Sequence, residues 1–107
     1  MIESLEMRIE LIFESNCPNV DAARDLLSRV LKDSGSSCEW LEWNRDDPDS
    51  PDYARKFGSP TILVNGHDVA GLEPKSDANC CRVYDHGKDG LKGVPTFEMI
   101  RDALSNS

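Results

Sequence analysis

The first part of the chain shows two apolar patterns in succession, one with the period of a strand and one with the period of a helix. Every second position of residues 7–13 is apolar, namely Met7, Ile9, Leu11 and Phe13. Ile12 adds an apolar side chain on the opposite side of the run. This pattern predicts a β-strand that is buried on both faces, as in a parallel sheet.

After a short polar turn, the apolar residues recur at helical spacing. They are Val20, Ala23, Leu27, Val30 and Leu31, with Ala22 and Leu26 beside them. A stripe of this width predicts an amphipathic helix that packs against a core. Pro18 suits the first helical position, because the N–H group that proline lacks would have no partner there. The polar residues 33–37 are expected to end the helix.

The apolar patterns in the middle of the chain are shorter. Residues 38–43 are rich in aromatic side chains and predict a second strand that begins at Cys38. The acidic loop over residues 44–49 is expected to be a solvated surface, and a carboxylate metal site is the less favoured alternative. Ser50 is expected to cap a short helix that has Pro51 at its first position and ends at Gly58.

Asn65-Gly66 is the strongest turn signal in the chain, and it predicts a two-residue hairpin whose first strand begins at Pro60. Residues 71–93 are interrupted by glycines, with one candidate strand over residues 80–84. The spacing of the apolar side chains near the C-terminus predicts a last helix over residues 95–104. Its inward face would consist of Phe97, Ile100, Ala103 and Leu104.

Composition limits the possible functions. The chain has 107 residues, of which 38% are hydrophobic, so we expect a single folded domain over residues 1–107. The net charge is −8 and no basic cluster is present, which argues against nucleic acid and anionic membrane as partners. We find no transmembrane run and no signal peptide, and therefore expect a cytoplasmic protein with reduced thiols. Its four cysteines then favour catalysis, redox chemistry or metal binding over a disulfide framework.

Cys17 is the main candidate for chemistry. It stands between the first strand and the first helix, where the positive end of the helix dipole favours the thiolate. A thiolate there can act as a nucleophile, whereas the alternative is a packed structural cysteine. His67 and His86 are expected to be surface residues rather than metal ligands.

The order of the elements resembles the thioredoxin superfamily in its small, glutaredoxin-like form. Cys17-Pro18-Asn19-Val20 stands at the place of the redox motif, and Ser59-Pro60-Thr61 resembles the cis-proline segment that abuts the reactive cysteine. The resemblance implies an α/β fold with a four-stranded mixed sheet flanked by three helices, in the order β-α-β-α-β-β-α. It also implies a cis peptide bond before Pro60, and substrate contacts from Pro18, Asn19, Ser59 and Pro60.

Further segments narrow the resemblance to a bacterial group of small thioredoxin-family proteins, some of which carry an alkylmercury-lyase-like label. These segments are Gly58-Ser59-Pro60-Thr61, Asn65-Gly66-His67-Asp68, Cys81-Arg82-Val83-Tyr84 and a Gly-x-Pro before the last helix. The chain departs from the superfamily at Val20, which replaces the second cysteine of the usual Cys-x-x-Cys. Residues 14–16 also lack the basic residue that glutaredoxins use for glutathione.

These observations lead to a thiol-based oxidoreductase without a cofactor, in which the Cys17 thiolate attacks a disulfide or a peroxide. Because Val20 cannot resolve the adduct, Cys81, Cys80 or an external thiol would do so, with Cys81 favoured over Cys80. The substrate would be a thiol or disulfide, on a small molecule or a protein. Two alternatives stay open: a soft-metal protein that binds mercury, copper or zinc through Cys17 and the Cys80-Cys81 pair, and an interaction module without chemistry.

Overall fold

The computed structural model describes residues 7–35, 39–75 and 82–106. A four-stranded sheet lies at its centre, formed by β1 (Ile9–Phe13), β2 (Leu41–Asn44), β3 (Thr61–Val64) and β4 (His67–Asp68) in the order β2-β1-β3-β4. β1 pairs parallel with β2 and antiparallel with β3, and β3 pairs antiparallel with β4. The predicted four-stranded mixed sheet in an α/β fold is therefore confirmed.

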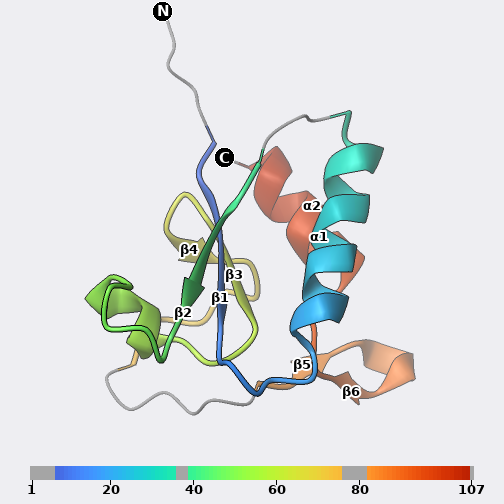
Figure 1. Ribbon diagram of the computed structural model, residues 1–107. Helices are drawn as coiled ribbons and strands as arrows, with labels where there is room; N and C mark the ends of the chain where they lie inside the picture. The colour runs from blue at the N-terminus through green and yellow to red at the C-terminus, as the bar shows by residue number, and fades with distance from the viewer. Residues whose placement is uncertain (1–6, 36–38, 76–81, 107) are drawn as a thin grey trace, which may run out of the picture.

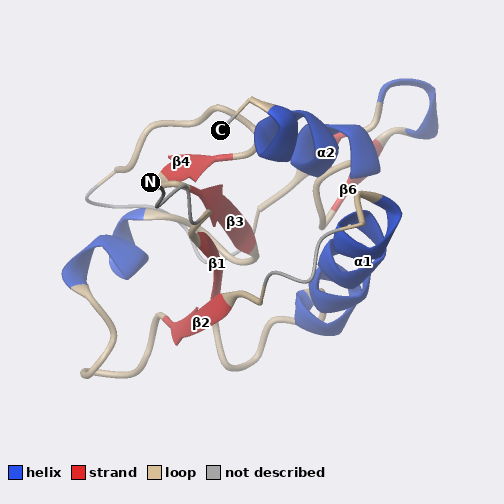
Figure 2. Ribbon diagram, turned by 90° about the horizontal axis from the view of Figure 1, so that it is seen from above, coloured by secondary structure: helices blue, strands red, loops and turns tan. Residues whose placement is uncertain are grey.

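Both α-helices cover one face of this sheet (Figures 1 and 2). α1 (Val20–Asp33) contributes most of the core on that side, where its apolar stripe packs on Ile9 and Leu11 of β1. α2 (Phe97–Ser105) adds Ile100, which is fully buried. The two helices fit the predicted stripes. Within the described residues, no helix is long and apolar enough to cross a membrane.

The helices begin later than the sequence predicts. α1 begins at Val20 rather than at Pro18, because the first helical carbonyl is that of Asn19, which accepts from the Ala23 N–H at 3.0 Å. α2 begins at Phe97 rather than at residue 95, because the Thr96 hydroxyl accepts from the Met99 N–H at 3.0 Å and so caps the helix.

The opposite face of the sheet is covered by a short 3-10 helix, η1 (Asp52–Lys56), seen on the other side of the sheet from α1 and α2. The expected third α-helix is thus wrong in type. Ser50 is not its cap, since the Ser50 hydroxyl donates to the Asn44 carbonyl at 2.8 Å and Pro51 precedes the helix. Ala54 and Phe57 are buried here, against Ile12 and Leu63.

Glu10 is the one charged residue within β1, and it is buried on the same face as η1. Its carboxylate accepts from Trp43 Nε1 at 2.7 Å and from the Tyr53 hydroxyl, and Arg8 pairs with it at 3.4 Å. A buried carboxylate with these partners is satisfied, and it ties β2 and η1 to the central strand.

Two further segments differ in extent from the prediction. β2 begins at Leu41, and Cys38, where the strand was expected to start, lies outside the described residues. The candidate strand over residues 80–84 is described only from residue 82 onward, where β5 (Tyr84–Asp85) forms a ribbon with β6 (Leu91–Lys92) around a second 3-10 helix, η2 (Gly87–Asp89). The hairpin at Asn65-Gly66 is confirmed, with Asn65 at φ 52° and Gly66 at φ 86°.

Candidate functional site

Cys17 lies in the turn between β1 and α1, and its N–H donates to the Glu14 carbonyl at 3.0 Å. Its side chain is half-buried and packs against the core on the α1 side of the sheet. Pro18 is exposed and belongs to the turn rather than to the helix. Because α1 begins at Val20, Cys17 stands one turn before the helix, and the dipole argument for the thiolate weakens accordingly.

The Ser59-Pro60 segment is joined directly to the turn that carries Cys17. The Ser59 hydroxyl accepts from the Glu14 N–H at 2.9 Å, and Ser59 itself is only 1% exposed. The Ser59-Pro60 peptide bond is cis, as the resemblance implies. The two motifs that the sequence singled out, Cys17-Pro18 and Ser59-Pro60, therefore meet at the start of β3.

Residues 82–84 lie on the other side of the Ser59-Pro60 segment. The Arg82 N–H donates to the Ser59 carbonyl at 3.0 Å, and the Tyr84 hydroxyl donates to the Pro60 carbonyl. The Arg82 guanidinium stands 4.3 Å from the centre of the Tyr84 ring, a cation–π contact. This segment thus contacts the backbone of both residues of the Ser59-Pro60 pair.

A buried ion pair fixes Arg82 in this position. Arg82 Nη1 lies 3.1 Å from Asp68 Oδ2, and the two side chains are 9% and 0% exposed. The same nitrogen donates to the Thr61 hydroxyl at 2.9 Å. Asp68 also accepts from the N–H groups of Ala70 and Leu72, so its carboxylate is held by backbone as well as by Arg82.

Tyr84 is buried, and its pKa responds to the charge of a Cys17 thiolate. Burial raises the pKa of Tyr84 above the ordinary value, and the negative charges of Asp68 and of a Cys17 thiolate add to this, while Arg82 acts in the opposite direction. The phenol therefore keeps its proton near neutral pH and can donate to the Pro60 carbonyl.

Asn19 closes the site against the β5–β6 ribbon. A Cβ atom at Gly93 would stand 2.1 Å from Asn19 Nδ2 and 2.4 Å from Asn19 Cγ, so the Asn19 side chain lies directly against the glycine. In Figure 1 the ribbon accordingly lies at the same end of the sheet as the turn before α1. The Gly-x-Pro segment thereby has a structural role beside Cys17.

The structure brings together four predicted site residues, Cys17, Asn19, Ser59 and Pro60, with Pro18 exposed at the rim. Cys80 and Cys81 lie outside the described residues. Sequence reasoning missed the roles of Arg82, Tyr84, Asp68 and Gly93. All four fall within the segments that carry the narrower resemblance, which was the available signal for them.

The acidic loop over residues 44–49 is more than a solvated surface, because two of its side chains bond to the turn that carries Cys17. Asp46 Oδ2 accepts from the Ser15 N–H at 3.3 Å, and Asn44 Nδ2 donates to the Ser15 hydroxyl at 2.9 Å. Asp47 Oδ1 accepts from the Asp49 N–H within the loop itself. These carboxylates are therefore used to order the loop and the adjacent turn.

Metal-ligating side chains do not gather in the described ranges, where no group of three His, Cys, Asp or Glu residues lies close enough to hold an ion. His67 is exposed on β4, while His86 is half-buried with Nε2 2.7 Å from the Val94 carbonyl oxygen. The soft-metal alternative depends on Cys80 and Cys81, which these ranges do not include.

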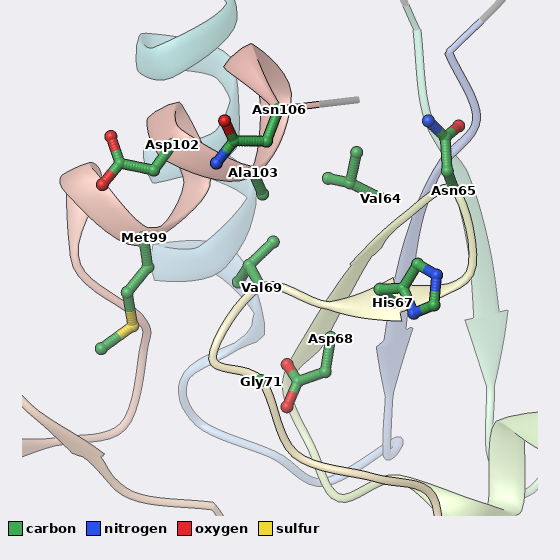
Figure 3. A pocket seen from close by; sticks show the side chains of 10 residues that line it. All are labelled: Val64, Asn65, His67, Asp68, Val69, Gly71, Met99, Asp102, Ala103 and Asn106. Atoms are coloured by element: carbon green, nitrogen blue, oxygen red, sulfur yellow. The ribbon is translucent and has the colours of Figure 1, made fainter.

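A separate cavity of about 530 Å³ lies between the β3–β4 hairpin and α2 (Figure 3). Apolar side chains such as Val64, Val69 and Ala103 form part of its lining, and His67, Asp102 and Asn106 add polar groups. None of the predicted site residues lines it. Asp68 does, and its carboxylate is the one that pairs with Arg82.

Comparison with family models, with curated proteins and with solved structures gives no match for this chain. A half-buried thiol, a backbone segment bonded to its turn and a neutral phenol form a small site in which a cysteine can react while its surroundings stay fixed.

Proposed function

We propose that this protein is a thioredoxin-like thiol redox protein in which Cys17 reacts with disulfides or peroxides. The observation that supports this most directly is the bond between the Glu14 N–H and the Ser59 hydroxyl, which joins the turn of Cys17 to the Ser59-Pro60 segment. Two motifs that are far apart in the sequence thereby form one site.

The thioredoxin-like assignment has support at the level of elements as well. The chain runs β1, α1, β2, η1, β3, β4 and, after the ribbon, α2. This is the order on which the resemblance depends, with a 3-10 helix in place of the middle α-helix and a two-stranded ribbon inserted before the last helix.

In the proposed reaction, the Cys17 thiolate attacks one sulfur of a substrate disulfide. A mixed disulfide forms between Cys17 and that sulfur, the substrate S–S bond breaks, and the other half leaves as a thiolate that takes up a proton. A second thiol then attacks the Cys17 sulfur and releases the bound half as a thiol. The two electrons come from the pair of thiols that ends as a disulfide.

The second thiol is proposed to be Cys81 or Cys80, or an external thiol. Arg82 directly follows Cys81 in the sequence, and its N–H is bonded to Ser59 in the segment that contacts the turn of Cys17. Cys81 is favoured over Cys80, because Cys81 belongs to the Cys81-Arg82-Val83-Tyr84 segment that carries the narrower resemblance.

The test is a stoichiometric oxidation of the reduced protein with hydrogen peroxide, followed by non-reducing peptide mass spectrometry. We expect a disulfide between Cys17 and Cys81 or Cys80, and we expect Cys17→Ser to abolish it. The variants Cys80→Ser and Cys81→Ser then identify the resolving residue. Only intermolecular adducts or over-oxidised Cys17, with both later cysteines free, would show that no internal thiol resolves the site.

A further inference from the structure

The Ser59-Pro60 segment is bonded to the turn that carries Cys17, and the protein itself already occupies its backbone carbonyl groups. The Ser59 carbonyl accepts from the Arg82 N–H at 3.0 Å, and the Pro60 carbonyl accepts from Tyr84. The Ser59 hydroxyl accepts from Glu14. An extended peptide gains most of its affinity for a sheet from main-chain hydrogen bonds, and here these acceptors are used.

The segment that occupies them is firmly attached. Arg82 and Asp68 form an ion pair with almost no solvent exposure, and Arg82 also bonds Thr61 and stacks on Tyr84. Removing either partner of such a pair leaves an uncompensated buried charge, which is strongly unfavourable. An incoming peptide would have to displace this network before it could bond to Ser59.

The Cys17 thiol, by contrast, is half-buried rather than enclosed, and the neighbouring Pro18 is exposed. A small disulfide needs only to reach the sulfur along the line of attack, without pairing with backbone. A small molecule can therefore reach the Cys17 sulfur, whereas a peptide strand finds the neighbouring backbone carbonyls already bonded.

We infer that Cys17 acts on small-molecule disulfides rather than on extended polypeptides, because residues 82–84, fastened by the Asp68–Arg82 ion pair, already bond to the backbone carbonyls of Ser59 and Pro60. This inference rests on the proposed function, and it narrows the substrate class of the same site. Asp68 and Arg82 are positioning residues, since they act through the segment that they fasten. The step is the exchange given above: the Cys17–substrate S–S bond forms, the substrate S–S bond breaks, and one thiol leaves.

The experiment compares two probes with the same leaving thiol on the full-length reduced protein. One is bis(2-hydroxyethyl) disulfide, and the other is a short neutral alanine-rich peptide whose single cysteine carries 2-mercaptoethanol as a mixed disulfide. Adduct formation at Cys17 is followed by intact mass and peptide mapping. We expect the small probe to react at least about tenfold faster, the factor that breaking one hydrogen bond of residues 82–84 to admit the peptide would produce.

Asp68→Asn and Arg82→Gln release the segment, and Arg101→Gln, which loses only an exposed contact with Asp102, is the matched control. We expect the two site variants to react faster with the peptide while the small probe changes by less than about twofold, and the control to match the wild type. Circular dichroism identifies a variant that has lost its fold, in which case the wild-type ratio of the two rates decides.

Equal rates of the two probes on the wild type would overturn the inference while leaving the proposed function intact. So would folded site variants whose rates rise equally for both probes. A wild-type Cys17 that reacts with neither probe would overturn the proposed function itself, and the two failures are therefore distinguishable.

Discussion

Some residues near Cys17 are in such close contact that one substitution tests one contact. Gly93 is the clearest example, because a Cβ atom there would overlap the Asn19 side chain. A glycine at this position was part of the resemblance, but nothing in the sequence indicated that it serves to admit the side chain of Asn19.

Gly93→Ala is therefore expected to destabilise the protein by about 1–3 kcal/mol, the usual cost of overpacking. The reason is steric, since the Asn19 amide must leave its place against the ribbon. The double variant Asn19→Ala/Gly93→Ala should recover most of the loss in urea unfolding, with Asn19→Ala alone as the control. Equal losses with and without Asn19 would show that the contact is not the cause.

Tyr84 gives a prediction for alkaline pH. Its pKa is raised by burial in the folded state, so the phenol contributes full stability below the unfolded-state pKa of about 10. As the pH rises from that value toward the folded-state pKa, the unfolded chain loses its proton first and the free energy of unfolding falls. The Tyr84→Phe variant should lack this part of the decline.

Urea unfolding at about pH 8 and about pH 11 measures the effect. Tyr53→Phe is a second test and should also lack part of the decline, because burial and the neighbouring Glu10 raise the pKa of Tyr53 as well. Wild type and Tyr84→Phe with identical alkaline declines would contradict the buried, neutral phenol.

At the scale of elements, the long periodic segments were predictable and the short ones were not. The apolar stripe of α1 buries one face of that helix and the apolar run of β1 is buried on both faces of the sheet, and both elements are present as predicted. The short helix was misjudged in type, because the Ser50 hydroxyl bonds to Asn44 across the loop, a tertiary contact that no local pattern reveals. Five residues, as in η1, are also too few to show a helical period.

Packing of α2 against α1 and the sheet is testable at Ile100. This side chain is fully buried in the cluster that contains Leu27 and Leu11. Ile100→Ala should cost about 2–5 kcal/mol and Ile100→Val about 0.5–1.5 kcal/mol in urea unfolding. The exposed Arg101→Ala should stay within about 0.5 kcal/mol of the wild type. A small, equal effect of both Ile100 variants would contradict the docking of α2.

For the whole molecule, the site could be predicted in part. Cys17 and the Ser59-Pro60 segment were identifiable because each belongs to a short motif of adjacent residues that includes a proline. Asp68 and Arg82 were not, because their ion pair joins the end of the hairpin to a segment beyond residues 69–81, and only the folded chain brings them together. Buried charges of this kind carry no periodic signal in the sequence.

The same ion pair connects the parts of the molecule around one point. Asp68 belongs to β4, Arg82 precedes the β5–β6 ribbon, and Thr61 begins β3. Through Ser59 and Glu14 this network reaches the turn of Cys17. Several segments of the fold therefore hold the residues around the Cys17 thiol in place, and the proposed function depends on this arrangement.

Competitive alkylation of the native protein tests this account most directly. A limiting amount of iodoacetamide is added near neutral pH, and peptide mapping measures the labelled fraction of each of the four cysteines, with the chemically unfolded protein as the reference for equal access. We predict that native Cys17 is labelled ahead of Cys38, Cys80 and Cys81. If another cysteine is labelled first and Cys17 stays unmodified, Cys17 is a structural residue and the proposed function is wrong.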